Sequence, residues 1–520
     1  MEKNLSDAFD QGITVTEMAA MDQPIDVLRE TTAAFVGRTL RGPLNEPVLL
    51  TGFGEFRRRF GDSWSRSSLG PAVQQFFAHG GKQLYVVRVA NNARGALICL
   101  PADGSALVLR ALEPGSTERI RAAVGYDGID DDELFNLTLQ RINPQTGLVL
   151  DQEFFRAVSF RDGHRKFVAD ALTGSGMVRA DRPLPTHRPE PTSGSNLPFG
   201  SSYIEQNQEG ADGHELSDYD LVGSMLHQQG LFALDKIDHF DLLYLPPPGK
   251  HRDLGLTSVL AAERYCRRRS AMLVVDPPAK WRSAIEAIHG IRDAGLASPN
   301  IVSYFPRLRQ RDVETAEPRP AGAALAGLLC KLDRRHGAWQ SLDLQGLGLH
   351  RSLVPAVELA AEQMYNLQRE GLNVVAAGPA GAARLIGSVT LSRGSDTHRQ
   401  FASLPVRRAC LQIFKTIEAA TRWAVFEPGN ARLATRVRAQ VAGYLACLAD
   451  LGAFENERII TECDAGLHKS AEQGFAIFIA FHPLGCPEPV SFTLHQSVAG
   501  CRVASTAFAP ASQGQAGKAI

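Results

Sequence analysis

The sequence lacks an excess of charge, clustered cysteines and long uncharged apolar runs. Its 55 Lys and Arg residues nearly balance its 56 Asp and Glu residues, so composition predicts neither nucleic-acid binding nor attraction to an anionic membrane. The 8 cysteines are scattered without a CxxC pair, which is typical of a reducing compartment. No segment approaches the ~18 apolar residues of a membrane span, and the first residues do not resemble a signal peptide. We expect synthesis in the cytoplasm without a signal peptide, and no membrane insertion.

Nucleotide-binding motifs are incomplete. Gly249 and Lys250 follow a predicted strand, but Tyr244 stands where a phosphate loop needs glycine and His251 where it needs Ser or Thr. The Gly346-Leu347-Gly348 sequence lacks the third glycine and the preceding turn of a dinucleotide fold. A loop and a turn are the simpler interpretations.

Nucleophile and metal motifs are equally weak. Ser175 lies between two glycines without matching a nucleophile elbow, and Cys463 with His468 lacks the further ligands of a tetrahedral site. The acidic run 127–133 lacks the spacing of a calcium loop and reads as a solvated turn. We therefore predict no catalytic residue, no cofactor and no metal, and we expect a protein that is not an enzyme.

The chain begins with an isolated strand pattern. Over Gly12–Glu17, Ile13 and Val15 face one way and Thr14 and Thr16 the other, the alternation of a half-buried strand. A single strand cannot satisfy its own backbone groups, so it must pair elsewhere. We expect residues 1–30 to be an extended arm that supplies this strand.

Two separated stretches, 31–96 and 231–375, alternate short apolar strands with helices, which favours a parallel sheet covered by helices. We interpret them as one discontinuous α/β domain. Between them, residues 97–180 contain short alternating runs separated by Pro, Gly and Asp, and they predict an inserted β-rich outer domain. Residues 181–230 are rich in Pro, Ser, Gly and His at their start, and they predict a flexible exposed connector.

The C-terminal domain is predicted over 376–498, with a flexible tail at 499–520. A helix opened by Pro405 has one apolar face, and a second amphipathic helix runs from Asn430 to Gly452. The strand at 475–481 is apolar on both faces, as a central strand should be. A further strand, Val490–His495, alternates cleanly and is expected to be detached from its own chain. Its inward-facing residues are Val490, Phe492 and Leu494.

Several stretches resemble the contractile tail sheath proteins, in the order of that family. The N-terminal stretch runs from AAFVGRTLRGP at Ala33 to LYVVRV at Val89, and the middle one from Asp241 to Gln340. The C-terminal ones are LPVRRACLQIFKTIEAATRW and its continuation to Leu445, and GFAIFIAFHPLGCPEPVSFTL to Leu494. One departure is the segment 383–388, where many sheath proteins carry a Trp-Gly-containing strand.

The resemblance implies a multidomain α+β and α/β fold with a C-terminal mixed sheet flanked by helices. It implies a structural subunit that polymerises into six-fold rings of a helical sleeve around an inner tube, and contracts to drive that tube through a target envelope. Its partners would be further copies of itself, the inner tube protein, baseplate and sheath-capping proteins, and any sheath paralogues. It would act within a phage tail or a contractile injection particle.

In that family, strands from the two chain ends are added to the C-terminal sheet of neighbouring copies. The residues that would do this here are Ile13, Thr14, Val15, Thr16, Val490, Phe492 and Leu494. Arg407, Arg408 and Lys415, on the polar side of the first long helix, are candidates for contact with the tube, and an ordinary solvated face is the alternative.

Two other functions stay open from the sequence alone. One is a baseplate or other structural component of the same machine. The other is an enzyme built on the central α/β domain, which would have a ligand pocket at the ends of its strands.

Overall fold

The computed structural model describes residues 25, 30–192, 203–249, 251–311, 317–343, 348–378, 383–392, 400–427, 429–456, 458–464, 474–497 and 500–504. The predicted strand Gly12–Glu17 lies outside these residues. The chain divides into two compact units. We call residues 30–336 with 340–404 the large unit, and residues 405–520 with 1–29 and 337–339 the C-terminal unit.

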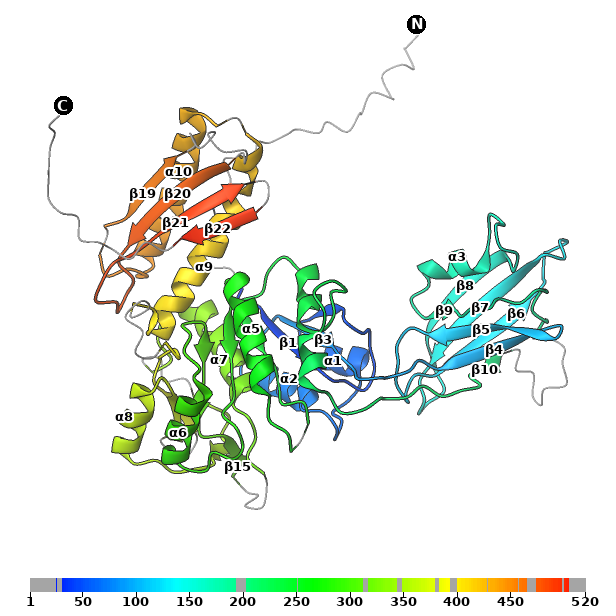
Figure 1. Cartoon of the computed structure of the whole chain (residues 1–520), viewed down its shortest axis with the longest axis horizontal. Helices are drawn as coiled ribbons and strands as arrows, with labels where there is room; N and C mark the ends of the chain where they lie inside the picture. The colour runs from blue at the N-terminus through cyan, green and yellow to red at the C-terminus, as the bar shows by residue number, and fades with distance from the viewer. Residues whose placement is uncertain are drawn as a thin grey trace, which may run out of the picture. The chain divides into compact units, whose positions relative to one another are not determined.

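A six-stranded sheet forms the centre of the large unit (Figure 1). Its order is β13-β12-β11-β1-β3-β2, and all neighbours are parallel except β2 with β3. The strands are β1 (Ala33–Gly37), β2 (Pro47–Leu50), β3 (Leu84–Arg88), β11 (Leu242–Tyr244), β12 (Met272–Val274) and β13 (Ile301–Val302). The central strand β1 is apolar throughout and wholly buried, as a strand covered on both faces must be. It joins strands from both predicted stretches, because it pairs with β3 and with β11.

Amphipathic helices pack around this sheet. They are α1 (Phe53–Phe60), α2 (Leu69–Ala78), α4 (Asp218–Val222), α5 (Leu256–Arg268), α6 (Ala284–Ala294), α7 (Gly322–His336) and α8 (Ala361–Arg369). Smaller sheets follow, formed by β14 (Tyr304–Phe305) with β17 (Asn373–Ala377) and β18 (Ala383–Ile386), and by β15 (Leu308–Gln310) with β16 (Leu353–Pro355). Because β18 pairs with β17, the predicted C-terminal boundary at residue 376 is too early, and the C-terminal unit proper begins at Pro405.

The β-rich segment folds into two small sheets around their own core, which we call the β-rich domain (Figure 1). One sheet has the order β10-β6-β7-β8 and the other β4-β5-β9. The strands are β4 (Leu97–Ala102), β5 (Ser105–Ala111), β6 (Ile120–Gly125), β7 (Leu134–Ile142), β8 (Val149–Ser159), β9 (Val178–Ala180) and β10 (Ile204–Glu205), with a short helix α3 (Val168–Ala171). The core includes Ile98, Leu109, Phe135 and Leu139.

The expected flexible connector over 181–230 is wrong for its described residues. Asp181 N donates to Val108 O at 2.8 Å, and Glu190 N donates to Pro101 O at 2.8 Å, so the first part is bonded to the β-rich domain. Strand β10 pairs with β6, and α4 begins at Asp218. Polar, Pro-rich composition predicted a lack of regular structure, but backbone hydrogen bonds to neighbouring strands hold this segment in place.

The C-terminal unit contains two long helices and a four-stranded sheet (Figure 1). The helices are α9 (Leu404–Thr421) and α10 (Ala431–Asp450), and the strands are β19 (Ile460–Asp464), β20 (Gly474–Phe481), β21 (Val490–Ser497) and β22 (Gly500–Ala504). The predicted tail from residue 499 therefore starts with a strand, and residues 505–520 lie outside the described part. No helix among the described residues is both long enough and apolar enough to cross a membrane.

Candidate assembly sheet

The sheet of the C-terminal unit is antiparallel throughout, in the order β19-β20-β21-β22. The prediction that 475–481 is a central strand is confirmed, because β20 pairs with β19 on one side and β21 on the other. Strand β21 is also central. Its residues Leu494 and Phe492 lie opposite Ile477 and Ile479 of β20, while His495 lies opposite Arg502 of β22.

The prediction that Val490–His495 lacks partners in its own chain is therefore wrong. Val490, Phe492 and Leu494 are at most 1 % exposed. Phe492 packs edge-on against Phe414 of α9, with ring centroids 3.9 Å apart and planes at 72°. Alternation correctly indicated one buried face, but an alternating pattern does not say which sheet buries it.

A buried polar contact fastens β21 to the helix beside it. The Gln496 side chain donates from Nε2 to Glu418 O at 2.7 Å, and Thr421 Oγ1 donates to Gln496 Oε1 at 2.9 Å. Gln496 is 4 % exposed and Thr421 is fully buried, so both partners would be costly to separate. Strand β21 is thus a fixed part of this sheet.

The two outer strands of the sheet present edges. Within the described residues, β19 pairs only with β20, and β22 pairs only with β21. On β19, Ile460, Glu462 and Asp464 are exposed, and Ile460 is 47 % exposed. An edge strand carries a row of backbone N–H and C=O groups that an extended segment of another chain can pair with. These edges are the candidate sites for assembly.

The predicted polar face of α9 is largely covered. Arg408 is 6 % exposed, and Arg407 and Lys415 are half-buried. The alternative of an ordinary solvated face is therefore wrong for Arg408, whereas contact of these residues with a tube stays a prediction. The apolar stripe on α9 was visible in the sequence, but burial of the opposite side depends on long-range packing.

Helix α10 has an exposed basic face that was not predicted from the sequence. Its inward face is Leu433, Val437, Val441, Tyr444, Leu445 and Leu448, as predicted. Its outward face exposes Arg432 and Arg438 beside a row of small residues, among them Ala442 and Gly443. The outward positions follow directly from the helical period of the inward ones, so the same pattern would have found them.

The strand ends of the six-stranded sheet, where an enzyme would bind its ligand, contain a closed polar cluster. Tyr244 donates to Asp276 Oδ2 at 2.6 Å, and Gly322 N donates to Asp276 Oδ1 at 2.8 Å. Burial raises the pKa of Asp276, which the hydrogen bond from Tyr244 and the charge of Arg307 oppose. Arg307 donates to Pro277 O at 2.8 Å and pairs with Asp253. Asp276 lies in the loop after β12, and its partners come from β11, the link between β14 and β15, and the start of α7, so the cluster ties these elements together.

The other weak motifs are placed as follows. Cys463 lies on β19, where burial first and then Asp464 raise its pKa to about 11, so the thiol stays protonated at neutral pH. In the acidic run, Glu133 pairs with Arg161 at 2.6 Å. Within the described residues, no group of three or more His, Cys, Asp or Glu side chains could hold a metal ion. Lys250, His468 and residues 346–347 lie outside the described residues.

Comparison with known proteins adds the following. No protein-family model and no curated protein sequence matches the chain. Among solved structures, the sheath tail protein of Listeria innocua matches with a TM-score of 0.61 at 14% identity, over 92% of this chain and 97% of that one. The sheath of the extracellular contractile injection system PVC in its contracted state matches with a TM-score of 0.52 at 14% identity, over 91% and 93%.

The helical sheath of the anti-feeding prophage, also contracted, has a TM-score of 0.52 at 14% identity, over 92% of this chain and 97% of that one. The chain therefore has the fold of tail sheath proteins across most of its length, and the resemblance predicted from the sequence is confirmed at the level of fold.

Proposed function

We propose that this chain, which has the fold of tail sheath proteins, is a structural subunit that polymerises into a helical sleeve around an inner tube. The observation that carries this is the agreement in fold over at least 91% of the chain with sheath proteins. The matching region includes both the α/β unit and the C-terminal unit, so the likeness is not that of one common domain. A structural role follows, with no catalytic site required.

Assembly proceeds by addition of strands to the sheet of the C-terminal unit. The N-terminal strand Ile13–Glu17 of one copy pairs with an edge of that sheet in a neighbour. Such a strand contributes about five backbone hydrogen bonds, at roughly 0.5 to 1.5 kcal/mol net each. The contribution per link is small, but a lattice of many copies multiplies it. Because β21 is packed into its own sheet, it belongs to the receiving side and not to the donated strand.

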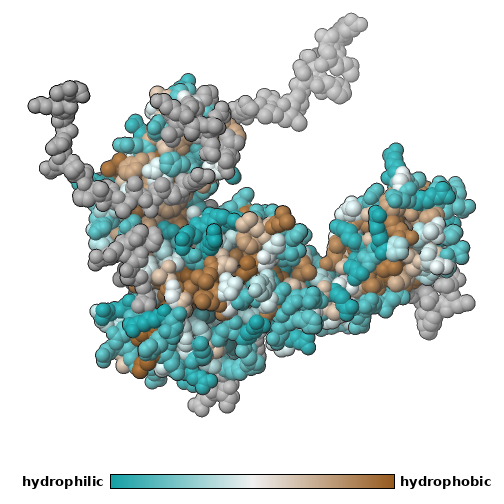
Figure 2. All heavy atoms as spheres, viewed as in Figure 1, coloured by the Kyte–Doolittle hydropathy of each residue, from teal (hydrophilic) through white to brown (hydrophobic). Residues whose placement is uncertain are grey.

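Apolar residues on the large unit supply a second kind of contact between copies. Figure 2 shows hydrophobic residues gathering over α5, where Leu256 is 46 % and Leu260 52 % exposed. Tyr219 on α4, which packs against α5, is 83 % exposed. Contiguous exposed apolar groups of this kind favour burial against another protein surface. In a sleeve, that surface belongs to the next copy.

The tube contacts the C-terminal unit through Arg407 and Lys415 of α9 and through the exposed Arg432 and Arg438 of α10. Contraction draws on a metastable packing set during assembly and released at the baseplate, because the chain carries no complete nucleotide motif. Baseplate and sheath-capping proteins bind the ends of the sleeve. Inner tube and sleeve together form part of a phage tail or a contractile injection particle.

Electron microscopy of the purified chain tests this proposal. We expect hollow sleeves or stacked rings. A deletion of residues 1–18 should give a folded chain, by circular dichroism, that no longer polymerises, because the arm completes a neighbour's sheet. A matched deletion of residues 508–520 serves as the control for loss of a chain end. Compact particles that never polymerise, or sleeves that form without residues 1–18, would contradict the proposal or its strand addition, respectively.

A further inference from the structure

Two chain segments connect the β-rich domain to the six-stranded sheet, and they run side by side (Figure 1). Arg94 N donates to Ala211 O at 2.9 Å, and Ala211 N donates to Arg94 O at 2.8 Å. Further along, His214 N donates to Asn91 O at 2.8 Å. We call this antiparallel ribbon, residues 91–97 and 208–214, the root of the β-rich domain. A ribbon of two strands alone is a natural hinge, since it is only marginally stable by itself.

Two buried arginines fasten the root to the sheet. Arg38 directly follows β1 and Arg88 ends β3, and they are 3 % and 2 % exposed. Arg38 donates to the carbonyl oxygens of Asp212 at 2.8 Å and Gly213 at 3.1 Å, and its guanidinium lies 4.4 Å from the ring centroid of Trp64. The carboxyl ends of β1 and β3 belong to the edge where open α/β sheets bind ligands. In this chain, the root of the β-rich domain lies at that edge, where a ligand would otherwise bind.

Arg88 reaches from the sheet to the β-rich domain. Its two terminal nitrogens donate to Gly42 O and Pro114 O, each at 2.5 Å. Burial lowers the pKa of Arg88 to about 10, against the opposing charges of Glu113 and Asp212, so the side chain stays charged at neutral pH. Pro114 lies between β5 and β6, so one guanidinium holds a carbonyl from each side of the junction.

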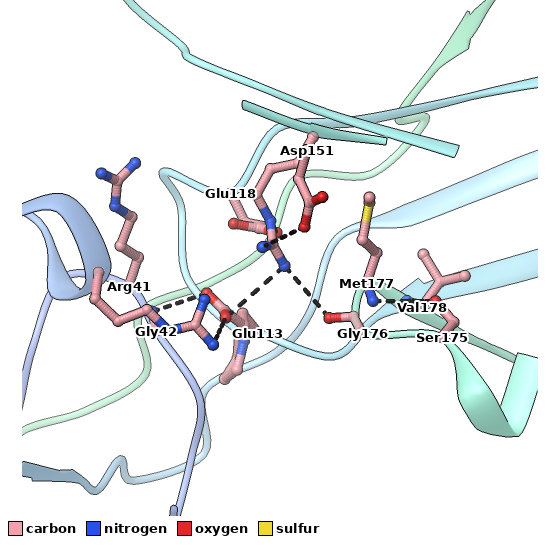
Figure 3. A network of polar contacts seen from close by, with 12 residues as sticks. Arg41, Gly42, Glu113, Glu118, Asp151, Ser175, Gly176, Met177 and Val178 are labelled. Carbon is pink, nitrogen blue, oxygen red and sulfur yellow. Dashed lines mark hydrogen bonds and ion pairs between the residues drawn. The ribbon is translucent and has the colours of Figure 1, made fainter. Parts of the chain in front are cut away.

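The carboxylates of Glu113 and Glu118 lie at the same junction and bind its arginines and backbone (Figure 3). Glu113 Oε2 accepts from Gly42 N at 2.9 Å, and Glu113 Oε1 lies 3.2 Å from Arg59 of α1. Arg141 of β7 pairs with Glu118 at 2.8 Å and lies 3.8 Å from Glu113. Glu113 therefore links the loop between β1 and β2, α1 and the β-rich domain, and its side chain is only 7 % exposed.

The backbones at the junction are in direct contact. A Cβ atom on Gly210 would lie 2.2 Å from Gly115 O, and one on Gly213 would lie 2.1 Å from Asn91 O. Gly213 also has φ +72°, a conformation that residues with a side chain rarely adopt. Such close approach leaves no room for the segments to slide past one another.

We propose that Arg38, Arg88, Glu113 and Arg141 form a fixed joint that holds the β-rich domain in one orientation on the α/β sheet. The joint replaces the ligand crevice of an α/β enzyme with buried charged contacts between the two parts. It turns a two-stranded hinge into a rigid connection, because any rotation would separate several buried charged groups at once. The inference does not depend on the proposed sheath function, since it concerns the single chain.

Hydrogen exchange measured by mass spectrometry on the full, unassembled chain tests the joint. In Glu113→Gln, we expect the amides of Gly42, Arg94 and Ala211 to exchange at least about 10-fold faster, while amides of β1 and β7 keep their rates. Glu133→Gln, which removes the carboxylate of an exposed ion pair in the same domain, is the matched control and should leave the root unchanged. Arg88→Lys keeps the charge but cannot span both carbonyls, and should give an intermediate acceleration.

Unchanged root amides in both Glu113→Gln and Arg88→Lys would overturn the proposal. So would equal acceleration across the root and β7, because the cluster would then support the fold of the β-rich domain and not its attachment. Limited trypsin cleavage after the exposed Arg94 gives a second readout. Cleavage there should be faster in the two variants than in wild type and the control, and equal rates would count against the joint.

Discussion

The sheets of the large unit and the C-terminal unit differ in which of their backbone groups the rest of the chain covers. The six-stranded sheet of the large unit has its strand ends covered by buried side chains, with Arg38, Arg88 and Asp276 all hydrogen-bonded within the chain. The sheet of the C-terminal unit has a packed centre and edges that, in the described residues, pair on one side only. The strand ends of the first sheet are covered by the chain itself, whereas β19 and β22 of the second sheet each pair on one side only among the described residues. The following changes test that difference, from the largest expected effect to the smallest.

The centre of the C-terminal sheet should be as costly to disturb as any core. Phe492→Ala removes a fully buried ring that packs on Phe414, so we expect the unit to lose about 3 to 5 kcal/mol of stability. Chemical denaturation followed by circular dichroism measures this. Phe426→Ala is the control, because Phe426 is 78 % exposed and should change little. A loss below ~1 kcal/mol at Phe492 would mean that β21 is not a permanent part of the sheet.

The joint of the large unit should lose much of its stability when one of its buried charges is removed. Arg141→Ala leaves Glu118 and Glu113 buried beside one another, and we expect a loss of about 3 kcal/mol in the unfolding free energy. Arg161→Ala removes an ion pair of similar length, 2.6 Å, whose side chains are 62% and 33% exposed. That control should cost less than ~1 kcal/mol. Equal losses of unfolding free energy in the two variants would mean that the buried junction is no more sensitive to loss of a charge than the exposed surface.

The edge of the C-terminal sheet should respond in assembly and not in folding. Ile460→Lys places a charge on β19, where Ile460 is 47 % exposed, so we expect the unfolding free energy to change by less than ~0.5 kcal/mol. Polymerisation, followed by light scattering, should shift to a several-fold higher protein concentration. Leu451→Lys is the matched control, since Leu451 is 48 % exposed but lies at the end of α10. If both variants polymerise normally, β19 is not the receiving edge.

The smallest effect is a dependence on pH. Burial raises the pKa of Glu118 above its ordinary value, and the charge of Arg141 only partly opposes this. A carboxyl with a raised folded-state pKa binds its proton more tightly when folded, so its contribution to stability falls as pH rises through the window above the ordinary value, about 4.3. Glu118→Gln removes this titration. The stability of the variant relative to wild type should therefore increase from pH 4 to pH 7, as measured by denaturation at each pH. A relative stability that decreases over that range would mean that Arg141 dominates.

The sequence predicted best what depends on local pattern. The apolar run of β20 indicated a central strand, and β20 is central in its sheet. The alternation of β21 indicated one buried face, but the pattern carries no information on the partner strand. The joint was not predicted, because Gly42, Glu113 and Arg141 are far apart in sequence and each is unremarkable where it stands. Burial of Arg408 was missed for the same reason, since it depends on packing across the fold.

The hydrogen-bonded pair of Arg94 and Ala211 has a practical consequence for engineering. The chain leaves the α/β sheet and returns to it at adjacent backbone positions, which is the geometry that tolerates domain exchange. The segment between these residues can therefore be exchanged as one piece. The acceptors of Arg38, Asp212 and Gly213, lie outside that segment and would remain, whereas the Pro114 carbonyl that Arg88 binds would be lost. A foreign domain with adjacent termini could be grafted there, provided that it offers Arg88 a carbonyl oxygen in that place.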